Sequence, residues 1–133
     1  MITDLDEDPK PTGELALQTV PMPKDTNASG DIFGGWLVSQ MDLAGAVTAA
    51  KLARGRVATV AIDKMTFMVP VKVGSVVSCY TSIKDVGRSS VTVQVEVWMS
   101  TIVDQMDQLT KVTEGRFVFV AIDEQRRTRA IPQ

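Results

Sequence analysis

The segment from Ile32 to Ala53 has the length of a helix and carries apolar side chains on every side. Gly55 follows the last basic residue, Arg54, at the place where a left-handed helix cap is expected. A helix that is apolar all round must be buried all round. In a chain of 133 residues, a sheet has to wrap around the helix to achieve that burial. The apolar residues are Trp36, Leu37, Val38, Met41, Leu43, Ala44, Ala46, Val47, Ala49, Ala50, Leu52 and Ala53.

The rest of the chain is rich in strand-forming residues. Between positions 91 and 97, valine alternates with polar residues at a period of two, which is typical of a half-buried strand. Strands are expected over residues 14–22, 57–69, 75–86, 91–99 and 110–122. The sequence therefore predicts an α+β protein with the hotdog fold, an antiparallel sheet wrapped around one long central helix.

The domain organisation is simple. Residues 1–13 are acidic and contain Pro9, Pro11 and Gly13, so we expect a flexible N-terminal lead-in there. Residues 14–133 are expected to form a single hotdog domain. Apolar residues between positions 57 and 67 point both ways, which indicates a strand that is covered on its second face or edge, for which another subunit is one candidate.

The chain contains no histidine, and this excludes several classes of active site. Serine–histidine and cysteine–histidine nucleophile pairs, imidazole metal sites and the usual general base near neutral pH are all ruled out. An enzyme built on this sequence has to work with carboxylates, hydroxyls, lysines, backbone amides or a bound cofactor. We expect no metal and no cofactor.

Charge and cysteine content indicate which cellular compartment and which classes of partner to expect. The net charge is −2 and the basic residues form no dense tract, which argues against nucleic acid as a partner. Cys79 is the single cysteine, so an intramolecular disulfide is impossible and a reducing compartment is expected. The acidic N-terminus is unlike a signal peptide, and no apolar stretch is long enough to span a bilayer. We expect a cytoplasmic protein without a membrane partner.

Asp42 lies in the middle of the apolar helix, and no basic residue stands three or four positions away. Removing a carboxylate from water costs several kcal/mol unless a partner offsets the loss. A charge in such a place is a candidate functional group. The alternative is that Asp42 pairs with a lysine or a backbone amide from a strand.

Two adjacent glycines, Gly34 and Gly35, stand at the start of the same helix. Each glycine inside a helix costs about 1 kcal/mol, so their presence calls for another explanation. Without side chains they let a ligand approach the first-turn N–H groups, which suit a developing oxyanion. The alternative is a helix-initiation turn with Asp31 as its cap. Oxyanion donors together with a carboxylate about two turns along are what ester or thioester hydrolysis needs without histidine.

The turn Gly87-Arg88-Ser89-Ser90 is rich in hydrogen-bond donors. It has the pattern of a tight hairpin turn, and its side chains could also hold a phosphate. Lys64, Arg54 and Arg56 are further possible phosphate contacts of low specificity. The arginines at positions 126, 127 and 129 are interpreted as a solvated tail.

Several short motifs, taken in order, make the sequence resemble the bacterial acyl-CoA thioesterases of the YciA type, from about Leu15 to Ile131-Pro132. They are Pro21-Met22-Pro23, Asp25-Thr26-Asn27, Gly30-Asp31-Ile32-Phe33-Gly34-Gly35-Trp36, Ser39-Gln40-Met41-Asp42, Gly55-Arg56-Val57, Met65-Thr66-Phe67, Gly74, Gly87-Arg88-Ser89-Ser90 and Glu96-Val97-Trp98. The resemblance implies hydrolysis of acyl-CoA to the free acid and CoA by a hotdog protein. It also implies dimers that assemble into a trimer of dimers.

The resemblance assigns roles to individual residues. It implies that Asp42 is the catalytic carboxylate, acting as general base or nucleophile, and that the Gly34 and Gly35 amides of the partner subunit hold the thioester oxygen. Either Asn27 or Asp31 would orient the water. The implied CoA contacts are Arg88, Ser89 and Ser90, with Thr59 and Val60 lining the pantetheine path by backbone groups and Lys64 as a further candidate.

Three other classes of protein remain to be weighed. A hotdog dehydratase generally pairs a histidine with a carboxylate, and this chain has no histidine. A non-catalytic protein that binds acyl-CoA or a nucleotide would keep the fold without releasing thiol. A purely structural oligomer would hold Asp42 as a paired core charge.

Overall fold

The computed structural model describes residues 10–101 and 109–133. Most of the predicted lead-in, residues 1–9, lies outside the described residues. The elements in chain order are β1 (Glu14–Thr19), the short 3-10 helix η2 (Pro23–Asp25), α1 (Gly34–Ala53), β2 (Val57–Phe67), β3 (Ser75–Val86), β4 (Ser90–Thr101) and β5 (Thr110–Ala121).

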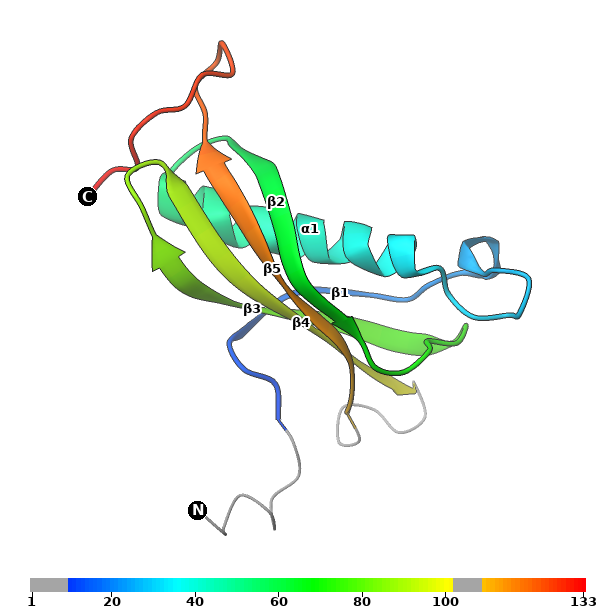
Figure 1. Ribbon diagram of the computed structural model, residues 1–133. Helices are drawn as coiled ribbons and strands as arrows, with labels where there is room; N and C mark the ends of the chain where they lie inside the picture. The colour runs from blue at the N-terminus through cyan, green and yellow to red at the C-terminus, as the bar shows by residue number, and fades with distance from the viewer. Residues whose placement is uncertain (1–9, 102–108) are drawn as a thin grey trace, which may run out of the picture.

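In the described part of the chain, the strands form one antiparallel sheet in the order β1-β3-β4-β5-β2 (Figure 1). α1 lies along one face of this sheet and contacts all of its strands. β1 and β2 are the two edge strands. The predicted α+β architecture, one long helix against an antiparallel sheet, is confirmed.

The strand boundaries differ from the predicted ones by a few residues. β1 ends at Thr19 rather than at position 22, because Pro21 has no N–H to donate to a ladder. β2 ends at Phe67 rather than at position 69, and β4 runs from Ser90 to Thr101, beyond the predicted span. β3 has the predicted bounds.

The core lies between α1 and the sheet. The alternating valines of β4 are fully buried, as are Phe117 and Phe119 on β5. Phe119 packs beneath Gly45 of α1, where an added Cβ atom would lie only 2.9 Å from the Cζ atom of the ring. α1 can approach the sheet this closely because Gly45 has no side chain.

The prediction that the helix is buried on every side is wrong for a single chain. Leu43 is 55% exposed and Val47 is 45% exposed, because one sheet covers only one side of a cylinder. On the opposite side of the helix axis, Met41, Ala44 and Ala49 are fully buried. The exposed apolar side of α1 is therefore available to another subunit.

Both ends of the helix differ from the prediction. α1 begins at Gly34 rather than at Ile32, with Phe33 as its N-cap at φ −57° and ψ 137°. The left-handed position at the other end belongs to Arg54, with φ 55° and ψ 47°, and not to Gly55. At Gly55 a Cβ atom would lie 2.6 Å from the Nη2 atom of Arg129, so this glycine leaves room for a neighbour.

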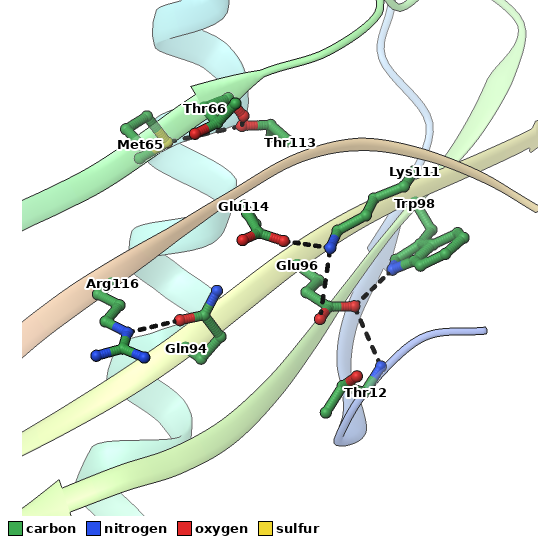
Figure 2. Close-up of polar contacts among 10 residues, drawn as sticks. All are labelled: Thr12, Met65, Thr66, Gln94, Glu96, Trp98, Lys111, Thr113, Glu114 and Arg116. Carbon is green, nitrogen blue, oxygen red and sulfur yellow. Dashed lines mark hydrogen bonds and ion pairs between the residues drawn. The ribbon is translucent and has the colours of Figure 1, made fainter. Parts of the chain in front are cut away.

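A charged network lies around Glu96 of β4 (Figure 2). The Oε1 atom of Glu96 accepts hydrogen bonds from the indole N–H of Trp98 at 2.9 Å and from the backbone N–H of Thr12 at 3.1 Å. Lys111 forms ion pairs with both Glu96 and Glu114. Glu96 and Trp98 are buried, and the hydrogen bond to Thr12 ties residue 12 of the predicted lead-in to the sheet.

The interpretation of the C-terminal arginines as a solvated tail is wrong for Arg129. Its Nε atom donates to the Ile122 carbonyl at 3.0 Å, and its backbone N–H donates to the Ala121 carbonyl at 3.0 Å. Ile131 is buried, and its N–H donates to the Arg88 carbonyl at 2.8 Å. The last residues pack against the end of the sheet because Ile131 is an apolar anchor that joins the core.

Candidate active site

Asp42 lies on α1 facing the edge strand β2. It is half-buried, and its Oδ1 atom accepts a hydrogen bond from the Thr59 hydroxyl at 2.6 Å. Among the described residues, no lysine or arginine forms an ion pair with Asp42. The alternative that Asp42 is a core charge paired with a lysine is therefore wrong for the described chain. The carboxylate is also less deeply buried than the sequence indicates, because β2 leaves that side of the helix partly open.

The glycines at the start of α1 present free backbone donors. The N–H groups of Trp36 and Leu37 both donate to the Phe33 carbonyl, so the hydrogen-bonded ladder begins at Trp36. Among the described residues, no backbone carbonyl accepts from the N–H of Gly34 or Gly35. Apart from its chain neighbours and the adjacent helix backbone, no described atom lies within 4 Å of where a Cβ of Gly35 would be, and both glycines are exposed. These two amides can therefore bind an oxygen atom from outside.

Asp31 is not the helix cap. Its carboxylate instead accepts from the Lys72 ammonium at 2.7 Å, and the helix has no side-chain cap. Asn27 organises the same loop, since its Oδ1 atom accepts from the N–H groups of Ser29 at 2.9 Å and Asp31 at 3.1 Å.

A cavity of about 360 Å³ opens beside the helix start. Asn27, Asp31 and Gly34 line it together with apolar side chains that include Leu37 and Phe67. Three candidate residues from two neighbouring sequence motifs thus line one cavity. Its mixed lining suits a ligand with a polar head and an apolar chain.

Asp42 and the glycine amides of the same chain are far apart. Asp42 follows Gly34 by eight residues, and at a rise of about 1.5 Å per residue the two are separated by about 12 Å along the helix. One thioester carbonyl cannot contact both groups within a single chain, because each contact requires about 3 Å.

The candidate CoA contacts fall into two groups. Thr59, Val60 and Lys64 lie on β2, where Val60 is 58% exposed and Lys64 has a left-handed φ of 52°. Arg88 and Ser89 lie in the turn between β3 and β4, and Ser90 begins β4. The pairs Val57 with Ala121 and Ser90 with Val120 place the start of β2 and this turn at the same end of the sheet (Figure 1).

The turn itself is held by backbone hydrogen bonds. Gly87 donates to the Ser90 carbonyl at 2.8 Å, as the predicted tight turn requires, and Ala121 donates to the Ser89 carbonyl at 2.8 Å. The Arg88 side chain is exposed and free to reach a ligand.

Sequence reasoning missed the hydrogen bond from Thr59 to Asp42. The two residues are seventeen positions apart and lie on different elements, so no local spacing signals their contact. Within the described ranges, no group of three or more histidine, cysteine, aspartate or glutamate residues could hold a metal ion. None of the helices described is long and apolar enough to cross a membrane.

Comparison with known proteins supports one class of activity. Residues 29–106 match the thioesterase superfamily. The chain is 49% identical over 123 residues to the acyl-CoA thioester hydrolase YciA of Escherichia coli (strain K12), covering 92% of this chain and 93% of the relative. The hexameric thioesterase y2039 from Yersinia pestis is 49% identical, with a TM-score of 0.87 over 93% of this chain and 99% of that one.

A second solved structure is HI0827, a hexameric broad specificity acyl-coenzyme A thioesterase, in a form with one aspartate changed to alanine. It is 48% identical to this chain and has a TM-score of 0.88, covering 92% of this chain and 88% of that one. The sequence and structural comparisons thus agree with each other over nearly the whole chain.

Proposed function

Because the chain belongs to the thioesterase superfamily, as an acyl-CoA thioester hydrolase of the YciA type with the hotdog fold, we propose that Asp42 and the Gly34 and Gly35 amides of a neighbouring subunit cleave the thioester together. The observation that carries this proposal is the set of groups that bind the Asp42 carboxylate. Its Oδ1 atom is bound by a neutral hydroxyl. In the described chain no cation pairs with Asp42, so its carboxylate is not held in an ion pair and can turn to a water molecule or a thioester.

The separation along α1 supports a site shared between subunits. Within one chain, Asp42 and the glycine amides are too far apart to serve one carbonyl. β2 is an edge strand with Val60 and Ile62 exposed, and Leu43 and Val47 are exposed on α1. Burial of these apolar side chains favours a dimer in which β2 and α1 meet their copies. A two-fold axis would then create two equivalent sites, each with Asp42 from one subunit and the amides from the other.

The hexameric state of the solved relatives supports a further assembly of three such dimers. The charge and the fold favour an acyl-CoA substrate over nucleic acid. In this proposal the acyl group enters beside the helix start, and the CoA part extends over β2 toward the turn that carries Arg88.

The chemistry follows from these positions. The carbonyl oxygen of the thioester accepts hydrogen bonds from the Gly34 and Gly35 amides, which stabilise the negative charge as the carbonyl carbon becomes tetrahedral. Asp42 either removes a proton from a water molecule that attacks this carbon, or attacks it directly to form a mixed anhydride that water then hydrolyses. Both routes break the carbon–sulfur bond and release the acid and CoA.

The remaining candidates would position the two ends of the substrate. Arg88, with Ser89 and Ser90, would bind phosphate oxygens of CoA, and the exposed Lys64 would add a further charge. The backbone of Thr59 and Val60 would line the pantetheine path. Asn27 or Asp31 would orient the water, since both line the cavity beside Gly34.

The test is release of CoA thiol from a series of acyl-CoAs of increasing chain length. Asp42→Asn and Asp42→Ala should each lower kcat by roughly 10²–10⁴-fold. Glu14→Gln is the matched control, because it removes an exposed carboxylate from β1, at the opposite edge of the sheet from β2. Size-exclusion chromatography should show the same assembly for all variants. Near-normal turnover by an assembled Asp42→Ala protein would refute the proposal.

A further inference from the structure

The segment that follows β5 folds back along the end of the sheet (Figure 1). Its turn is fixed by the Asp123 carboxylate, whose Oδ1 atom accepts hydrogen bonds from the backbone N–H groups two and four residues further on, each at 2.9 Å. Aspartate often fixes a turn in this way. Thr128 then returns beside Ile122 in an antiparallel bridge. We call residues 122–131 the return segment.

The return segment holds the turn between β3 and β4. The Arg88 carbonyl accepts from the N–H of Ile131 at 2.8 Å, and the Ser89 carbonyl accepts from the N–H of Ala121, directly before the segment, at 2.8 Å. The Ile131 side chain is 4% exposed and belongs to the core, whereas both of its chain neighbours are exposed. Ile131 is therefore the apolar anchor that fixes the end of the segment against the turn.

The same segment also contacts the start of β2. The N–H of Ile122 donates to the Arg56 carbonyl at 3.0 Å, and the Nε atom of Arg129 donates to the Ile122 carbonyl at 3.0 Å. In the sheet order, β5 separates β2 from β4. The return segment thus spans this gap and joins the two groups of candidate CoA contacts, which lie on β2 and in the turn that carries Arg88.

We infer that Ile131 is a positioning residue for the CoA end of the substrate, an inference that rests on the proposed contact of Arg88 with phosphate. By fixing the Arg88 carbonyl, the return segment fixes the backbone from which the exposed guanidinium extends. Arginine binds phosphate oxygens through two parallel N–H groups, so the contact depends on orientation as well as on charge. Asp42 lies about 16 Å along α1 from Ala53, the helix end beside the return segment, so the anchor affects binding rather than the chemical step.

The test measures kcat and KM for an acyl-CoA and for the same acyl group on N-acetylcysteamine, a thioester that lacks the phosphates. Ile131→Ala should raise KM for the acyl-CoA by about 5–20-fold with kcat unchanged, because a charge-assisted contact made in both the ground state and the transition state is weakened. The kcat/KM for the N-acetylcysteamine thioester should stay within about two-fold of the parent, since that substrate does not reach Arg88. A role in folding alone would not separate the two substrates.

Two variants serve as controls. Ile131→Leu keeps an apolar anchor of the same volume and should leave KM for the acyl-CoA within about two-fold of the parent. Val77→Ala also truncates a fully buried side chain, but near the start of β3, at the other end of the strand from the turn. It should lower stability and leave both KM values unchanged. All variants are compared as assembled protein after size-exclusion chromatography.

The second arm places Ile131→Ala in an Arg88→Ala background. Arg88→Ala alone should raise KM for the acyl-CoA, and an unchanged KM there would remove both the phosphate contact and the inference. If the anchor acts through Arg88, Ile131→Ala should cause no further rise in that background. Multiplicative rises in KM would overturn the inference. An equal rise in KM for the two thioesters in Ile131→Ala would also overturn it, because the anchor would then maintain the whole site.

The two proposals fail differently. Normal turnover by an assembled Asp42→Ala protein refutes the proposed function whatever Ile131 does. A raised KM in Arg88→Ala together with an unchanged KM in Ile131→Ala refutes only the positioning role. Should Ile131→Ala not assemble, Asp123→Ala carries the same test, because it removes the carboxylate that fixes the turn of the return segment. Removing a negative charge by itself favours an anionic substrate, so a raised KM would reflect lost position, and an unchanged or lowered KM would refute the inference.

Discussion

Replacing Gly45 by alanine tests whether the close packing of α1 on the sheet sets both stability and activity. In an open helical position, glycine to alanine stabilises by about 1 kcal/mol, because alanine has the higher helix propensity. At Gly45 the new Cβ atom would lie 2.9 Å from Cζ and 3.0 Å from Cε2 of Phe119. Carbon atoms pack best at about 3.5–4.0 Å, so the overlap is about 0.5–1 Å.

The ring of Phe119 has little room to yield. It is fully buried and stacks on Phe117 with 6.3 Å between ring centroids. The added methyl would also touch Cγ2 of Val95 at 3.5 Å. Overpacking of this kind costs about 1–3 kcal/mol. After the gain in helix propensity, Gly45→Ala should lower the free energy of unfolding by about 0–2 kcal/mol.

Urea unfolding, followed by tryptophan fluorescence, measures this change. All variants are compared at one protein concentration, because assembly stabilises the folded subunit by mass action. The matched experiment is a double-mutant cycle with Phe119→Leu, whose smaller side chain relieves the overlap. The two substitutions should couple favourably by at least about 0.5 kcal/mol. The kcat of Gly45→Ala should also fall several-fold with KM unchanged, since a displaced helix moves the Asp42 carboxylate.

Two results would contradict this reasoning. The first is stabilisation of Gly45→Ala by the full 1 kcal/mol or so expected for an unhindered helix position. The second is strict additivity with Phe119→Leu. Either would mean that α1 and the sheet separate at this point without cost, so that Gly45 does not set the position of the helix.

Two further predictions concern buried groups away from the site. Glu96→Ala leaves the buried indole N–H of Trp98 without its acceptor and should lower the free energy of unfolding by about 1–3 kcal/mol in urea titrations, the cost of one unsatisfied buried donor. The N–H of Thr12 also loses its acceptor, but Thr12 is exposed and water can replace it. Glu96→Gln keeps an acceptor, so its free energy of unfolding should fall by less than half as much. Equal losses in the two variants would show that the charge matters more than the hydrogen bonds. Burial raises the pKa of the Cys79 thiol to about 12, so at pH 8–9 it should react with a thiol reagent only after unfolding, because only the thiolate reacts. Rapid stoichiometric labelling of the native protein would contradict this.

The architecture could be predicted from the sequence because its signals are local. Val91, Val93 and Val95 alternate with polar residues, and this alternation identified the central strand β4 and the face that it buries. The polar carboxylate of Asp42 stands out against an apolar helix, and paired glycines mark the first turn. Composition, periodicity and the absence of histidine were enough to name these residues as candidates.

The site geometry could not be predicted in the same way. The hydrogen bond from Thr59 depends on a bulge in β2 and on the close approach at Gly45, and both arise from the packing of distant segments. The burial of Ile131 and the packing of Arg129 against Gly55 likewise depend on where the chain end meets the sheet. No pattern within one segment encodes these contacts.

The sequence by itself determined which elements form and which residues could carry chemistry, because helical and strand periodicities depend on neighbours along the chain. Tertiary structure decided that Asp42 is held by Thr59 rather than by a cation, that it lies about 12 Å from the glycines of its own chain, and that one side of α1 stays exposed. The physical reason is that strand register and helix position are fixed by side chains that meet across the sheet, and those contacts exist only once the whole chain has folded.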